Sequence, residues 1–253
     1  MLFSYTFQPT NLVGFFLCGD YMNFEQTVLK AVREHVIYFS GYSTFSGYYI
    51  VGSFMQCKRC IFMEPKDIDV IIVTTETAEI GEKEYSFFIE EADNIEVNVT
   101  VLTPTENQIA IQRLEPKYFD AFSSSKSIQW DIDRIRNISN SEIRSKVMKF
   151  SDLAFNKGKK KLTIEKDYDE ELGLKNICHA YRFLIDAIRF YYPSTHLLEK
   201  EMMDLGYSKY RHRVYKIYKN TQGTLDDKYQ AMVKYAKPEY NRMCSEFRKL
   251  FPR

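Results

Sequence analysis

Two aspartates stand at the beginning of a strongly apolar stretch of the sequence. Asp67 and Asp69 precede the apolar run 70–73 and are separated by a single isoleucine. On a β-strand, residues two apart project from the same face, so the two carboxylates lie side by side while Ile68 points to the opposite face. Two like charges this close disfavour each other's ionisation unless a cation is shared between them. We therefore predict that these carboxylates bind Mg²⁺ or Mn²⁺, because hard cations take one or two carboxylates together with substrate phosphates.

A glycine and a serine end another short apolar run and offer a site for phosphate. Gly52 and Ser53 follow the run 48–51, and thirteen residues separate them from Asp67. A glycine after a strand lets the backbone approach a ligand closely, and successive N–H groups and a serine hydroxyl donate hydrogen bonds to phosphate oxygens. Together with the two aspartates, this pair predicts a triphosphate site.

This combination resembles the signature of the nucleotidyltransferase superfamily related to DNA polymerase beta. That signature is an apolar residue and Gly-Ser or Gly-Gly, a spacer of this length, and then Asp-apolar-Asp/Glu-apolar. Here it reads Val51-Gly52-Ser53 and Asp67-Ile68-Asp69-Val70. Over residues 23–102 the resemblance implies a metal-dependent enzyme that transfers a nucleoside monophosphate from a nucleoside triphosphate to an acceptor, with pyrophosphate leaving in line.

The third acidic residue of that signature is expected on a following strand. Residues 95–101 alternate between apolar and polar side chains, which predicts a strand in a sheet with one packed face and one polar face. The best register for the third carboxylate falls on Asn98, whose amide is a poorer metal ligand, and Glu96 lies two residues earlier on the same face. Two alternatives stay open: an active transferase, or a catalytically weakened or inactive nucleotide-binding or regulatory module of the same fold.

A cationic stripe is predicted on one helix of the C-terminal half. Lys175, His179 and Arg182 are spaced i, i+4 and i+7, so they fall on one helix face and are candidates to bind the triphosphate or an acceptor phosphate. The stripe is similar to a lysine-to-histidine-to-arginine helix found in a set of predicted bacterial and viral nucleotidyltransferases. The alternative is a solvated face paired with acids. The acids near in sequence are Asp169, Glu170, Glu171 and Asp186.

Two further basic clusters have two interpretations each. Residues 157–161 hold four lysines around a glycine, and residues 207–213 interleave tyrosines with cations. Both patterns suit contact with nucleic-acid phosphates, and both are also typical of a solvated turn or an ordinary helix with one wet face. A third class of function is an interaction protein built around aromatic-rich helices. In such a protein, Asp67 and Asp69 would have no role in binding a metal ion.

The scaffold predicted around these residues has two parts. Helical periodicity is expected at 23–39, 140–157, 172–190, 208–218 and 226–250, with Pro193, Gly206 and Gly223 between the last three helices, and β-type runs are expected at 48–51, 67–74 and 95–101. The predicted fold class is therefore α/β (α+β), with an N-terminal mixed sheet and flanking helices followed by a C-terminal helical bundle. We predict a nucleotidyltransferase-like domain over 1–115 and a helical domain over 116–253.

Composition limits the possible partners and the compartment. The 35 basic and 34 acidic residues leave a net charge of +1, so any basic surface must be local. No apolar stretch approaches the roughly 18 to 20 residues of a membrane span, and no membrane partner is expected. Five cysteines favour a reducing, cytoplasmic compartment, and Cys57 and Cys60 supply only two of the four ligands of a structural zinc. The acceptor stays open between a protein, a small molecule and RNA.

Overall fold

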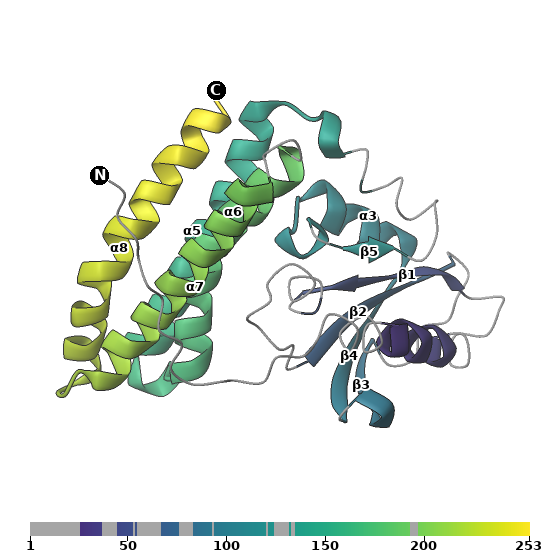
Figure 1. Ribbon diagram of the computed structural model, residues 1–253, viewed down its shortest axis with the longest axis horizontal. Coiled ribbons are helices and arrows are strands. Elements are labelled where there is room, and N and C mark those ends of the chain that lie inside the picture. The colour runs from purple at the N-terminus through teal and green to yellow at the C-terminus, as the bar shows by residue number, and fades with distance from the viewer. Residues whose placement is uncertain are drawn as a thin grey trace, which may run out of the picture.

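A computed structural model of the chain describes residues 26–36, 45–52, 54, 67–75, 83–92, 94–119, 121–123, 132, 135–192 and 197–253 (Figure 1). Four residues singled out above, namely Ser53, Cys57, Cys60 and Pro193, lie outside the described residues.

The N-terminal half is built on a five-stranded mixed sheet. Its strands, in the spatial order β3-β4-β2-β1-β5, are β1 (Phe45–Val51), β2 (Asp67–Thr74), β3 (Glu84–Ile89), β4 (Ile95–Leu102) and β5 (Phe122–Ser123). The β2 and β4 strands run parallel, and the other neighbouring pairs are antiparallel. The predicted strands at 48–51, 67–74 and 95–101 correspond to β1, β2 and β4, so the mixed sheet is confirmed.

Both faces of the central strands are buried. On one face, side chains such as Ile68, Val70 and Val97 form a core with the helix at 26–36, drawn in purple in Figure 1. On the other face, Tyr49 and Ile71 belong to a larger core cluster that extends through the C-terminal helices. The prediction of one packed and one polar face was therefore wrong for β1 and β2, because the helical half covers their second face. The more exposed, polar part of this face lies at the beginning of β2, on the neighbouring residues of β4 and on β3.

Long helices form the C-terminal half and lie together beside the sheet (Figure 1). They follow α3 (Pro104–Gln112) and are α5 (Asn140–Thr163), α6 (Glu170–Tyr191), α7 (Leu197–Asn220) and α8 (Leu225–Leu250). Side-chain caps define several starts: Ser139 accepts from the Glu142 N–H of α5, and Thr224 and Asp227 form a capping box on α8. In the described part of the chain, no helix is both long and apolar enough to span a membrane.

Two expectations about helix boundaries were wrong. Gly206 lies inside α7 rather than in a break. A side chain there would have no neighbour within 4 Å, so the glycine weakens the helix only through its backbone freedom. The lysine cluster at 157–161 continues α5 instead of forming a turn. Gly223, with φ 119°, does lie in the break before α8, where its conformation disfavours other residues.

The close contact between α5 and α6 depends on two glycines. A Cβ atom added at Gly158 would lie 2.8 Å from the carbonyl oxygen of Gly173 and 2.9 Å from the backbone nitrogen of Ile177. A Cβ atom added at Gly173 would lie 2.6 Å from the side chain of Leu162. Ser151 adds a buried hydrogen bond from α5, donating its hydroxyl to the carbonyl of Ala180 at 2.7 Å. This contact fixes the position of α6, the helix that carries the predicted cationic stripe.

We expect Gly158→Val to lower the free energy of unfolding by about 1–3 kcal/mol or more, because the added atoms meet backbone that cannot move away. Gly206→Ala is the matched control. It fills open space on α7, so we expect it to raise the free energy of unfolding by about 0.5–1 kcal/mol. Urea unfolding of both variants measures the difference, and a Gly158→Val protein as stable as the wild type would contradict the close packing described here.

Candidate functional site

The parallel pairing of β2 with β4 brings four polar side chains together at one end of the two strands. Asp67 is paired with Glu96, and Asp69 is paired with Asn98. Paired residues on neighbouring strands project to the same face and lie about 4.8 Å apart at the backbone. Glu96 and Asn98 are therefore both neighbours of the aspartates, one beside each. Sequence reasoning weighed these two residues as competitors for one position, and the register places both in the same row.

The edge strand β3 extends this row on the far side of β4. Ser86 is paired with Asn98, and Phe88 is paired with Glu96. Phe88 is 60% exposed although it is a large aromatic residue. Sequence analysis did not predict β3. In β3 the adjacent Phe87 and Phe88 place an aromatic side chain on each face. This interrupts the alternation of polar and apolar residues by which a half-buried strand is usually recognised in a sequence.

Gly52 makes room for the carboxylate of Asp69. The last residue of β1, Val51, is paired with Asp69, and Gly52 follows with φ 76°, in the left-handed region that favours glycine. A Cβ atom at Gly52 would collide with Oδ2 of Asp69. The sequence predicted that a ligand approaches Gly52 closely. In the structure, the close neighbour of Gly52 is the side chain of Asp69. The phosphate-binding role of Gly52 stays a prediction.

The carboxyl group of Asp69 is held in an unfavourable electrostatic environment. Burial raises the pKa of Asp69 and the neighbouring Asp67 raises it further, while Lys175, Lys117 and Arg182 act in the opposite direction. The net result is a raised pKa, so the charged carboxylate is incompletely compensated by the protein alone. Because Lys175 and Arg182 act on Asp69, these two cations of the α6 stripe lie within electrostatic reach of that β2 carboxylate.

Lys117 was not found by sequence analysis. It belongs to the short 3-10 helix η2 (Pro116–Tyr118), and its Nζ lies 3.2 Å from a carboxylate oxygen of Glu115. An isolated lysine behind a proline looks like any surface lysine in the sequence. Only the three-dimensional arrangement relates it to Asp69.

The three residues of the α6 stripe have different environments. The Nε of Arg182 lies 3.3 Å from Oδ2 of Asp186, and the two side chains are only 13% and 7% exposed. Lys175 is exposed, and within the described residues it is not part of an ion pair. Burial lowers the pKa of His179 to about 3, with Arg182 and Lys175 adding to the effect, so its imidazole is neutral at physiological pH.

Only one of the four nearby acids forms an ion pair with the stripe among the described contacts. That acid is Asp186, the partner of Arg182. Asp169 caps α6 by accepting a hydrogen bond from the Leu172 N–H. Glu170 accepts from the hydroxyl of Tyr168, and Glu171 accepts from that of Tyr215.

The donor set at this end of the sheet suits a hard cation that also has substrate ligands. Within the described residues, no three His, Cys, Asp or Glu side chains are grouped so that they hold a metal ion by themselves. Asp67 and Asp69 nevertheless offer two carboxylates on one face, and burial together with the neighbouring Asp67 raises the pKa of Asp69. Mg²⁺ is commonly bound in this way, by one or two carboxylates together with substrate phosphates and water.

No protein-family model and no curated protein match the chain. Among solved structures, the chain is similar to the crystal structure of a nucleotidyltransferase-like protein from Exiguobacterium sibiricum 255-15. The alignment has a TM-score of 0.34 and 11% sequence identity, and it covers 87% of this chain and 78% of that chain.

We expect Asp69→Asn to raise the free energy of unfolding at pH 7 in buffer containing a chelator. A carboxyl group whose folded pKa lies above its unfolded value binds more protons in the folded state, so stability falls as the pH rises from below the unfolded pKa of 3.8 through the folded pKa. The asparagine side chain does not ionise, so the Asp69→Asn protein does not lose this stability as the pH rises. The advantage of Asp69→Asn should therefore be largest at pH 7 and shrink toward pH 4.

Urea unfolding at several pH values measures this difference, and Asp67→Asn is the matched variant. Removing the charge of Asp67 should relieve part of the same unfavourable interaction. A wild-type protein that is more stable than Asp69→Asn at pH 7 without metal would contradict the electrostatics described above.

Proposed function

We propose that the chain is a nucleotidyltransferase that moves a nucleoside monophosphate from a nucleoside triphosphate to an acceptor by metal-dependent phosphoryl transfer. The observation that supports this proposal most is the pairing of β2 with β4, which sets Asp67 beside Glu96 and Asp69 beside Asn98 on one face. The cations that act on Asp69 supply the complementary charge for a triphosphate. Mg²⁺ is the proposed cofactor.

In this reaction the acceptor hydroxyl attacks the α-phosphorus of the nucleotide. A new P–O bond forms to the acceptor, the bond from the α-phosphorus to the bridging oxygen breaks, and pyrophosphate leaves. Asp67 and Asp69 would hold the divalent cation, which when bound stabilises the charge on the phosphates. Glu96, beside Asp67, is the proposed acceptor of the proton released by the attacking hydroxyl.

The remaining polar residues would bind and orient the triphosphate. Lys175 and Arg182 carry fixed positive charge, and Asp186 holds the guanidinium of Arg182 in one orientation. His179, whose pKa is lowered to about 3, would contribute a hydrogen bond and not a charge. The amide of Asn98 next to Asp69 would donate a hydrogen bond that orients the carboxylate.

A second candidate function is a nucleotide-binding module without transfer activity. The observation that favours it is Asn98, which occupies the position directly beside Asp69 and supplies an amide instead of a third carboxylate. Such a protein would bind the triphosphate at the same place and release it unchanged. The two candidates agree about binding and differ in turnover, so they require separate measurements.

Nucleotide binding is tested by thermal unfolding with each nucleoside triphosphate and MgCl₂. A ligand that binds only the folded state, at about 100 times its dissociation constant, adds about 2.7 kcal/mol to the free energy of unfolding. We expect this stabilisation in the wild type and its loss in Asp67→Ala/Asp69→Ala. Glu239→Ala/Glu246→Ala on α8 removes the same charge elsewhere and should keep the response. If no triphosphate stabilises the wild type, the proposed site is wrong.

Turnover is tested with a nucleoside triphosphate labelled at the α-phosphate and a cell lysate separated into protein, RNA and small molecules. We expect the wild type to transfer label to one fraction, Glu96→Gln to reduce the rate about 100-fold or more through loss of the general base, and Asn98→Asp to increase it. Unchanged transfer by Glu96→Gln would contradict the role of Glu96. Binding of nucleotide without transfer by the wild type would favour the second candidate function.

A further inference from the structure

The segment from Leu205 to Leu225 carries charged side chains of one sign only. It contains five Lys and Arg residues and one His, and it contains no Asp or Glu. The whole chain has a net charge of only +1, so this segment departs strongly from the balance elsewhere. The five cations are Lys209, Arg211, Arg213, Lys216 and Lys219.

Most of these charged side chains lie on the exposed face of α7. Tyr207, Tyr210, Val214 and Tyr218 form its buried face and belong to the larger core cluster. The side chains of Lys209, His212, Arg213, Lys216 and Lys219 are exposed, whereas Arg211 is only partly exposed. In the part of the chain that the structure describes, none of the five cations forms an ion pair with an acid.

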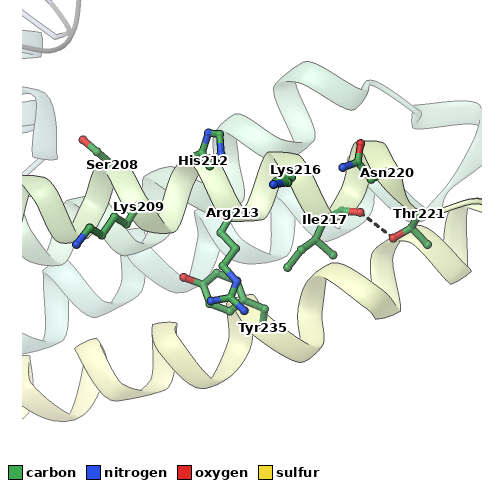
Figure 2. A pocket seen from close by; sticks show the side chains of 9 residues that line it. All are labelled: Ser208, Lys209, His212, Arg213, Lys216, Ile217, Asn220, Thr221 and Tyr235. Atoms are coloured by element: carbon green, nitrogen blue, oxygen red, sulfur yellow. Dashed lines mark hydrogen bonds between the residues drawn. The ribbon is translucent and has the colours of Figure 1, made fainter. Parts of the chain in front are cut away.

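A groove of about 900 Å³ runs along this charged surface between α7 and α8 (Figure 2). Lys209, Arg213 and Lys216 line it from α7, and Tyr235 lines it from α8. The guanidinium of Arg213 points across to α8 and lies 4.6 Å from the centre of the Tyr235 ring. Asn220 lines the groove near the end of α7.

The size of the groove and the chemistry of its lining suit a chain of phosphates with attached bases. From Lys209 to Asn220 the helix rises about 16 Å, which is long enough to contact several consecutive nucleotides. Exposed lysines attract phosphates, and an aromatic ring with an arginine beside it offers a flat surface on which bases stack. An acidic peptide would use the cations but has no need of the exposed Arg213 stacked on the half-buried Tyr235, so the lining favours nucleic acid.

We propose that the α7–α8 groove is a binding site for single-stranded nucleic acid. Lys209 and Lys216 contact phosphates, and Arg213 and Tyr235 together hold a base by stacking. This binding is independent of the transfer reaction proposed above, because it involves none of the residues at the end of β2 and β4. Local charge, rather than the overall charge of the protein, supplies the attraction.

Fluorescence anisotropy tests the proposal with labelled 20-nucleotide strands of uridine and of deoxythymidine and with a 20-residue polyglutamate peptide. The variant Lys209→Gln/Arg213→Gln/Lys216→Gln should bind both strands at least tenfold more weakly than the wild type. The control Lys149→Gln/Lys166→Gln/Lys249→Gln makes the same change in net charge away from the groove and should keep the wild-type affinity. Equal losses in the two triple variants would overturn the proposal, because attraction by overall charge would then explain binding.

Salt dependence separates phosphate contact from stacking. Each phosphate contact contributes about −0.7 to the slope of log affinity against log salt for single strands, so loss of the Lys209 and Lys216 contacts should make the slope of the groove variant shallower by about 1.4. Tyr235→Leu should lose about fivefold or more in affinity with an unchanged slope, because stacking releases no counterions. Absence of strand binding by the wild type at 50 mM salt, or tighter binding of polyglutamate than of either strand, would overturn the proposal.

Failure of this proposal is distinguishable from failure of the proposed transferase. The groove variant keeps Asp67 and Asp69, so its stabilisation by magnesium and nucleoside triphosphate should equal that of the wild type. Conversely, Asp67→Ala/Asp69→Ala should bind the single strands with wild-type affinity.

Discussion

The parallel pairing of β2 with β4 is the constraint on which the rest of the site depends. One register sets four polar side chains in a row, and the same register buries Ile68 and Val97 on the opposite face against the helix at 26–36. A slip by one residue would exchange the two faces, moving carboxylates into the core and aliphatic side chains out of it. Packing therefore selects the arrangement in which two like charges are neighbours.

The helical half compensates this arrangement only in part. Lys175, Lys117 and Arg182 act on Asp69 from other elements, and yet the pKa of Asp69 remains raised by burial and by Asp67. Arg182 is itself engaged by Asp186, so part of its charge is already balanced within α6. The charged form of Asp69 is therefore disfavoured in the folded protein, and a cation bound beside it would favour that form.

Local pattern was enough to predict β2 and β4, because strict alternation and an apolar run behind two acids are properties of consecutive residues. It was also enough to place Lys175, His179 and Arg182 on one helix face. The pattern was not enough for β3, in which the exposed Phe88 breaks the alternation. Nor did it find Lys117 or the contact between Gly52 and Asp69, since both depend on how separate elements meet.

The glycine contact between α5 and α6 bears on how mutational data for this chain should be interpreted. Gly158 and Gly173 touch only other parts of the protein, but α6 holds its charged side chains where it does because these two residues lack a Cβ atom. In a saturation screen scored by cellular activity, both positions would tolerate as little as a residue that meets the substrate. Loss of activity on substitution of these two glycines would therefore reflect the packing of α6 rather than contact with substrate. Measuring the abundance of each variant together with its activity distinguishes the two causes.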